Sequence, residues 1–119
     1  YVQIDKEKMS KSLGNFFTIR EILAQDSLPE RMGEIIRFMV LGSHYRSPLN
    51  YSDEALHNAH AALARIYKLA ERIIELPVAE APDAESSWMQ RFDHAMSDDF
   101  NTPEALAVLF DLIRTINKQ

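Results

Sequence analysis

The sequence of 119 residues contains no cysteine. This absence excludes disulfide bonds, thiolate zinc sites and thiol nucleophiles, and it fits a reducing compartment without proving one. No apolar run reaches the roughly 20 residues that a membrane-spanning helix needs. Residues 1–12 also lack the continuous apolar core of a signal peptide. These absences predict a cytoplasmic protein that does not contact a membrane.

Basic residues are outnumbered by acidic ones. Thirteen Lys and Arg against 18 Asp and Glu give a net charge of −5, which excludes nucleic-acid binding through bulk positive charge. The charge is unevenly distributed, however. Residues 1–51 contain seven basic and six acidic side chains (+1), whereas residues 52–119 contain six and twelve (−6). We therefore expect any anionic ligand to bind the first half of the chain.

Length and composition predict one small globular domain or a piece of a larger protein. Hydrophobic residues at 46% and charged residues at 26% are close to the averages for globular proteins. The chain starts at Tyr1 rather than at an initiator Met, which favours a piece with a cut N-terminus. A final helix that is apolar over most of its circumference predicts that further helices cover it.

Apolar spacing and capping residues predict a mainly α-helical fold, part of a helical bundle, with a short N-terminal strand. Alternation of Val2 and Ile4 predicts a strand within residues 1–5, followed by an exposed loop over 6–15. A capping box of Thr18 and Glu21 predicts a short helix that ends before Pro29. Four more helices are expected, over 30–41, 53–74, 88–96 and from 102 onward, separated by connectors at 43–51, 77–87 and 97–101.

Two capping residues set the starts of the longest predicted helices. Ser52 is the expected N-cap of the helix over 53–74, whose apolar stripe extends to Ile73 and Ile74. Thr102 is the expected N-cap of the final helix, with Pro103 at its first position, where a missing N–H costs little.

The one compact motif with chemical character is Lys8-Met9-Ser10-Lys11-Ser12, followed by Leu13-Gly14-Asn15. Two ammonium groups three residues apart in a loop can converge on adjacent phosphate oxygens. Serines are small enough to allow that approach, and Gly14 permits a sharp turn. Such a loop suits a reaction in which charge develops on a leaving pyrophosphate. The alternative is a solvated surface loop.

The motif resembles the signature loop of class I aminoacyl-tRNA synthetases, and the residues after it resemble the cysteinyl-tRNA synthetases. In place of the Val or Ile and Asp-Pro of other members, this chain has Phe16-Phe17-Thr18-Ile19-Arg20-Glu21. Two later blocks match cysteinyl-type sequences in the same order: His44-Tyr45-Arg46-Ser47-Pro48-Leu49-Asn50-Tyr51-Ser52 and Asp98-Asp99-Phe100-Asn101-Thr102-Pro103-Glu104-Ala105-Leu106. The resemblance therefore covers nearly the whole chain.

This resemblance implies a piece of a multidomain α/β enzyme that activates cysteine with ATP and Mg²⁺ and transfers it to tRNA(Cys). Residues 1–17 would end the catalytic domain, 18–51 would contact the tRNA stem, and 52–119 would begin the anticodon-side helical bundle. That bundle is named after an Asp-Ala-Leu-Arg motif, which this chain does not contain literally. The whole enzyme is expected to be a monomer.

The resemblance also implies roles for the residues of the loop. Lys11 would be the main contact to the ATP phosphates, Lys8 would assist, Met9 would anchor the loop, and Ser10 and Ser12 would shape it. The family's histidine motif and the ligands of its cysteine-selecting Zn²⁺ are not in this sequence, so no metal ligand is expected here. We therefore expect the 119 residues alone to be inactive.

Four residues near the connector are candidates for contact with tRNA: Arg37, His44, Tyr45 and Arg46. Arginine and aromatic side chains in a polar connector suit phosphate contact and base stacking. Two other functions stay open. One is a homologous ligase that joins cysteine to an amino sugar, whose members tend to have Arg in place of Leu13 and to lack the Phe-Phe-Thr run. The other is a non-catalytic helical adaptor that binds RNA or protein.

Other chemically suggestive residues have simpler interpretations. His57 and His60 have metal-ligand spacing on a helix but no obvious third ligand, which favours an exposed pair. Asp98 and Asp99 could bind Mg²⁺, but charge before a helix N-terminus explains them as well. The aromatic residues Trp88, Phe92 and Phe100 could stack on bases, although Trp88 and Phe92 lie on an apolar stripe, which favours the core.

Overall fold

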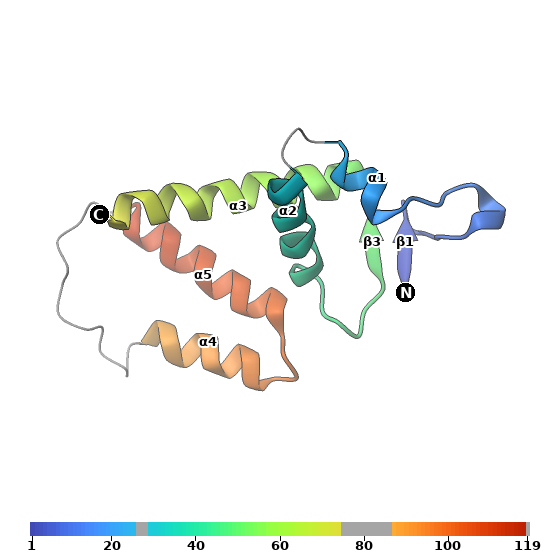
Figure 1. The fold of residues 1–119 in the computed structure, drawn as a ribbon. Coiled ribbons are helices and arrows are strands. Elements are labelled where there is room, and N and C mark those ends of the chain that lie inside the picture. Colours follow the sequence, from blue (N-terminus) through green and yellow to red (C-terminus); the bar gives the residue numbers. More distant parts are fainter. Residues whose placement is uncertain (26–28, 75–86, 119) are drawn as a thin grey trace. The chain divides into compact units, whose positions relative to one another are not determined.

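The computed structural model describes residues 1–25, 29–74 and 87–118 (Figure 1). These residues form a small three-stranded sheet and five α-helices, which confirms the expected mainly helical fold. The strands are β1 (Val2–Ile4), β2 (Glu7–Lys8) and β3 (Leu49–Tyr51), and a 3₁₀ helix, η1, covers Lys11–Leu13. The α-helices are α1 (Ile19–Leu23), α2 (Pro29–Leu41), α3 (Asp53–Ile74), α4 (Ser87–Ser97) and α5 (Thr102–Ile116). The connector predicted over 77–87 lies outside the described residues, except for Ser87 at the start of α4.

The sheet corrects two of the expected connectors. Its strand order is β2-β1-β3, so residues 6–15 and 43–51, both predicted as irregular, each contribute a strand. β1 pairs antiparallel with β2, and it pairs parallel with β3, where Gln3 lies opposite Asn50. A parallel pair needs a crossover connection, which α1 and α2 supply. The prediction missed β2 and β3 because each forms by pairing with β1, a partner that lies elsewhere in the chain.

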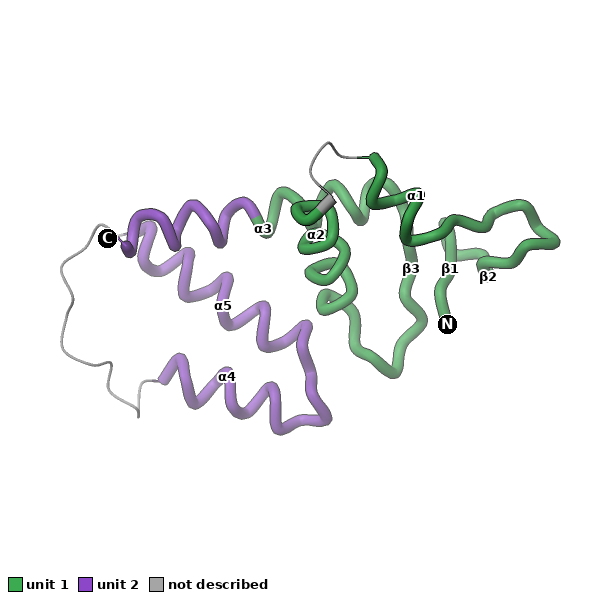
Figure 2. The backbone as a smooth tube through the Cα atoms, viewed as in Figure 1, with its two compact units in different colours: residues 1–63 green, residues 64–119 purple. Residues whose placement is uncertain are grey.

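The chain divides into two compact units, residues 1–63 and 64–119, with the boundary inside α3 (Figure 2). In the first unit, the core lies between α2 and α3, where Met32, Ile35, Leu56 and Ala59 are buried. Side chains of α1 pack against the same cluster, among them Ile22 and Leu23. Tyr51 of β3 is also buried, outside this cluster.

Two predicted helix caps of the first unit are confirmed. The Glu21 N–H donates to Thr18 Oγ1 at 3.1 Å, and the Thr18 N–H donates to the Glu21 carboxylate at 2.6 Å, which completes the capping box. The hydrogen bond from the Thr18 backbone N–H has the largest effect on the Glu21 carboxyl and lowers its pKa below the ordinary value, and the bond from the Thr18 hydroxyl lowers the pKa further. Ser52 Oγ accepts from the Ala55 N–H at 3.0 Å and caps α3 as expected.

In the second unit, α4 and α5 pack against each other (Figure 1). Ala95 of α4 is completely buried, and Ala105, Val108 and Ile113 of α5 are buried too. The predicted cap of α5 was wrong by one residue. Asn101, not Thr102, is the N-cap, because its Oδ1 accepts from the Glu104 N–H at 3.3 Å. Pro103 is therefore the second residue of α5, still within the first turn, where its missing N–H costs little.

Several apolar residues expected in the core are exposed. Phe92 is 41% exposed, Ile74 is 82% exposed, and Trp88 is half-buried. On α5 the apolar residues other than the three buried ones are half-buried or, for Ala107, exposed, so this helix is not covered on most sides by the described residues. Leu69 is the one buried residue in the part of α3 that belongs to the second unit. Periodicity predicts which face of a helix is apolar. Burial of that face also requires a second element that packs along its whole length.

An ion-pair group joins α4 to α5. Arg91 donates to Asp111 Oδ2 at 2.9 Å, and Arg114 lies 3.3 Å from Oδ1. The hydrogen bond from Arg91, followed by the charges of Arg114 and Arg91, holds the pKa of Asp111 below its ordinary value. The group is exposed, so its contribution to stability is modest.

We predict that this group makes stability depend on pH. A carboxyl with a lower pKa in the folded than in the unfolded state stabilises the fold above its unfolded pKa, and that contribution is lost as the pH falls through the folded pKa. Asp111→Asn should lower the midpoint of thermal unfolding at neutral pH, and the difference from the parent should shrink as the pH falls below 3.8, the ordinary pKa of an aspartate carboxyl. A difference that stays constant from neutral to acidic pH, measured by circular dichroism, would contradict this assignment.

No helix among the described residues is long and apolar enough to cross a membrane.

Candidate functional site

The β1–β2 hairpin carries the lysine motif at its open end. Its turn, at Asp5 and Lys6, has φ of 47° and 70°, the left-handed backbone of a tight hairpin turn. Asn50 of β3 stabilises this turn, because its Oδ1 accepts from the Lys6 N–H at 2.8 Å. Beyond β2, the Met9 N–H donates to the Val2 carbonyl at 3.2 Å. The sheet therefore fixes the direction in which the chain leaves Lys8.

Residues 8–15 form a compact loop closed by its own polar groups. Ser10 Oγ accepts from the Leu13 N–H at 3.3 Å and lies 3.1 Å from Ser12 Oγ, so Ser10 caps η1. Gly14 ends η1 in the left-handed conformation with φ of 69°, which glycine adopts at little cost. Its N–H donates to the Lys11 carbonyl at 3.3 Å. The loop predicted as irregular thus contains one helical turn that carries Lys11.

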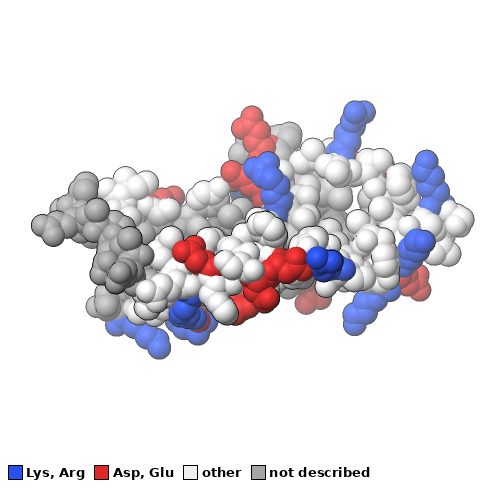
Figure 3. Space-filling model, turned by 90° about the horizontal axis from the view of Figure 1, so that it is seen from below, with Lys and Arg blue, Asp and Glu red and all other residues white. Residues whose placement is uncertain are grey.

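Both lysines of the motif are exposed. Lys11 Nζ lies over the Phe16 ring, 5.4 Å from its centroid, in a cation–π contact. Figure 3 shows Lys and Arg side chains projecting around this loop. The arrangement therefore presents positive charge to solvent, as a contact to phosphate requires.

The connector before β3 holds a cluster of three neighbouring residues. The rings of His44 and Tyr45 stack with centroids 4.9 Å apart, and the Arg46 guanidinium lies 5.2 Å from the Tyr45 centroid. The Arg46 N–H also donates to His44 Nδ1 at 3.2 Å. Tyr45 and Arg46 are exposed, as is the fourth candidate, Arg37, on α2. The sequence predicted these residues as candidates but did not predict that three of them stack.

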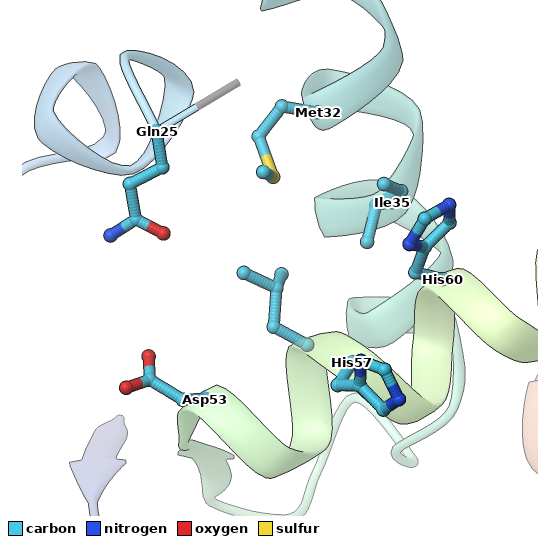
Figure 4. A pocket seen from close by; sticks show the side chains of 7 residues that line it. Gln25, Met32, Ile35, Asp53, His57 and His60 are labelled. Atoms are coloured by element: carbon cyan, nitrogen blue, oxygen red, sulfur yellow. The ribbon is translucent and has the colours of Figure 1, made fainter.

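A pocket of about 430 Å³ in the first unit was not predicted (Figure 4). Gln25 and Asp53 point toward one another at one end, and Met32 and Ile35 of α2 form an apolar wall. The remaining lining residues come from α3: Leu56, His57 and His60. No sequence signal marks this pocket, because its lining comes from two helices and from the turn after α1.

The two histidines of the pocket do not form a metal site in this structure. His57 is exposed, as predicted, whereas His60 is half-buried and accepts from an Arg31 N–H at 2.7 Å. Among the described residues, no group of three or more His, Asp or Glu side chains is placed to hold a metal ion. The chain contains no cysteine either, so its residues do not fit the thiolate zinc site that the resemblance implies.

The second unit contains a groove of about 490 Å³ beside the α4–α5 contact. Its polar lining includes Arg91, His94 and Glu104. Arg91 is already used, because it pairs with Asp111 and lies 5.0 Å from the Trp88 ring centroid. Asp98, one of the two acidic residues considered for Mg²⁺, accepts from Asn101 Nδ2 at 3.4 Å in the turn before α5. The contacts of Arg91 and Asp98 therefore stabilise α4, α5 and the turn between them.

Two family models match the chain. The model described as "tRNA synthetases class I (C) catalytic domain" matches residues 1–61, which include the lysine loop and the three-residue cluster. The model described as "DALR domain" matches residues 91–119, which include α5. The first match covers the N-terminal half of the chain and the second covers its last 29 residues.

The chain is also similar to cysteine–tRNA ligases of several bacteria. It is 56% identical to the ligase of Methylococcus capsulatus over 119 residues, which is 99% of this chain and 24% of that protein. The identity is 53% to the ligase of Hydrogenovibrio crunogenus over 119 residues, which cover 100% of this chain and 24% of that protein. With the ligase of Alkalilimnicola ehrlichii it is 52% over 118 residues, 99% of this chain and 24% of that protein. The chain thus spans about a quarter of the length of these relatives.

Proposed function

Since the chain belongs to the family of class I (C) tRNA synthetase catalytic domains, we propose that it is a segment of a cysteine–tRNA ligase. The enzyme activates cysteine with ATP and transfers it to tRNA(Cys). The observation that carries the proposal is the exposed, internally bonded loop with Lys8 and Lys11, which lies inside the matched catalytic segment. Identities above 50% with three cysteine–tRNA ligases support the same substrate.

In the activation step, the loop acts on the phosphates. The cysteine carboxylate oxygen forms a bond to the α-phosphorus of ATP, and the bond from that phosphorus to the bridging oxygen breaks, so pyrophosphate leaves with the electron pair. Lys11, with Lys8 assisting, neutralises the charge that develops on pyrophosphate. Ser10 and Ser12 shape the loop through their hydrogen bonds. Met9, which is half-buried, anchors it.

The three expected parts of the chain remain our proposal. Residues 1–17 end the catalytic domain, 18–51 contact the tRNA stem, and 52–119 begin the helical bundle. The order of the two family matches supports this arrangement. Their borders do not coincide with these limits, because the catalytic match extends to residue 61.

Most of the proposed enzyme's other components are supplied from outside this chain. Mg²⁺ accompanies ATP, and a Zn²⁺ that binds the cysteine thiolate would be held by residues elsewhere in the enzyme, because this chain has no cysteine. We accordingly propose that the 119 residues alone do not activate cysteine, and that the complete enzyme is a cytoplasmic monomer.

The full-length protein that carries this chain tests the proposal. Incubated with ATP, Mg²⁺ and cysteine, it should exchange pyrophosphate into ATP and charge tRNA(Cys). Cysteine-dependent pyrophosphate exchange followed by ligation of cysteine to an amino sugar, and not to tRNA, would favour the amino-sugar ligase. Binding of tRNA without any exchange would favour the adaptor. The presence of Leu13 and the Phe16-Phe17 pair argues against the amino-sugar ligase.

We predict that the His44–Tyr45–Arg46 cluster binds tRNA. Arg46→Ala removes a charge suited to a phosphate, and Tyr45→Ala removes an exposed ring suited to stacking on a base. Each change should raise the KM for tRNA(Cys) about fivefold or more and leave cysteine-dependent pyrophosphate exchange, which needs no tRNA, at the parent rate. Steady-state charging kinetics measure the first quantity. An unchanged KM for tRNA in both variants would remove the cluster from the interface.

A further inference from the structure

We infer that Asn15 is a positioning residue that sets the placement of Lys8 and Lys11, an inference that rests on the proposed function. Its side-chain amide joins the two ends of the loop. Asn15 Oδ1 accepts from the Ser10 N–H at 2.9 Å, and Asn15 Nδ2 donates to the Lys8 carbonyl oxygen at 3.3 Å. The Asn15 side chain therefore contacts the backbone of Lys8 and the backbone of Ser10, which caps the turn that carries Lys11.

The chemistry of these two bonds requires an amide. The Ser10 N–H can only donate and the Lys8 carbonyl can only accept, so the side chain that bridges them must offer one acceptor and one donor. Asparagine has both at the right length. Aspartate has the same shape but offers only acceptors when ionised, and its second oxygen would face the Lys8 carbonyl.

The bonds act on the loop and not on the core. Lys8, Lys11, Ser12 and Leu13 are exposed, and η1 contains no buried residue. Asn15 itself is half-buried. With so little packing, the polar bonds of the loop determine its conformation. Loss of the Asn15 bonds should free the lysines to move while the helices behind them stay folded.

This freedom matters for only one of the two chemical steps. Ammonium groups lower the barrier to activation when they are already placed where charge develops on pyrophosphate, and ordering them during the reaction costs free energy. Transfer of cysteine from the adenylate to tRNA releases no pyrophosphate. A positioning role for Asn15 therefore predicts a slower activation step with an unchanged transfer step.

The test uses the full-length ligase that carries this chain. In Asn15→Ala, kcat for cysteine-dependent pyrophosphate exchange should fall about tenfold, with the KM for cysteine unchanged. Single-turnover transfer from preformed adenylate to tRNA(Cys) should proceed at the parent rate, and the thermal midpoint should stay the same. Asn15→Asp, which keeps the side-chain shape and removes the donor, should lose at least as much. Asn58→Ala, at an exposed position of α3, is the matched control and should exchange at the parent rate.

Three results would overturn the inference. An active parent with equal exchange in Asn15→Ala would show that the amide does not position the lysines. Equal loss of exchange and transfer, together with a lower thermal midpoint, would assign Asn15 a structural role. A parent protein without cysteine-dependent exchange would overturn the proposed function, and this inference with it. The exchange rate of the parent protein alone distinguishes this result from the first two.

Discussion

Replacing Lys11 with alanine should lower kcat for cysteine-dependent pyrophosphate exchange by about 10²- to 10³-fold in the full-length enzyme. The ammonium group is exposed on a turn that its own loop holds in place, so it is available to a ligand. Charge develops on the departing pyrophosphate during activation, and a preplaced cation stabilises that transition state more than it stabilises bound ATP. The loss should therefore appear mainly in kcat and less in the KM for ATP.

Two other lysines of the same hairpin calibrate this result. Lys8→Ala should lose less activity than Lys11→Ala, because we propose that Lys11 makes the main phosphate contact and that Lys8 assists. Lys6→Ala should exchange close to the parent rate, because Lys6 lies in the β1–β2 turn, outside the motif. Equal losses in all three variants would indicate a general effect of positive charge. A parent-like rate in Lys11→Ala would contradict the phosphate role.

Ile35→Ala should destabilise the first unit by about 3 kcal/mol. Ile35 is 2% exposed and lies in the buried cluster between α2 and α3. Its truncation removes apolar contacts and leaves a cavity in a core that contains few other buried residues. Urea unfolding of the 119-residue chain, followed by circular dichroism, should show a lower midpoint.

Ile19→Ala is the matched control, because it removes the same atoms from a side chain that is 67% exposed. Its effect on the free energy of unfolding should stay within about 0.5 kcal/mol. If both variants unfold at the same urea concentration, the α2–α3 cluster is not the core of this unit.

Local signals predicted the helices because each signal acts within a few residues. The Thr18–Glu21 capping box and the Ser52 cap are bonds between residues three apart, so the sequence displays both partners together. The predicted N-cap of α5 was wrong by one residue because Asn and Thr, the residue types at 101 and 102, are both favoured at N-caps. Strands β2 and β3 could not be predicted in this way, since each depends on a partner strand elsewhere in the chain.

The candidate site was predicted in part for the same reason. The lysine motif is contiguous, so its place and charge could be recognised from the sequence. The turn that holds Lys11 depends on the side chains of Ser10 and Asn15, whose bonds follow from the backbone path. The stacking of His44, Tyr45 and Arg46 and the pocket near Asp53 likewise depend on geometry that no spacing rule supplies.

A segment exchange tests the central assignment most directly. The 119 residues would replace the matching quarter of the Methylococcus capsulatus ligase, with which they share 56% identity, and charging of tRNA(Cys) with cysteine would be measured. The account predicts that the exchanged enzyme charges tRNA(Cys) and that Lys11→Ala within the new segment abolishes most of this activity. A folded exchanged enzyme that neither exchanges pyrophosphate nor charges tRNA(Cys) would contradict it.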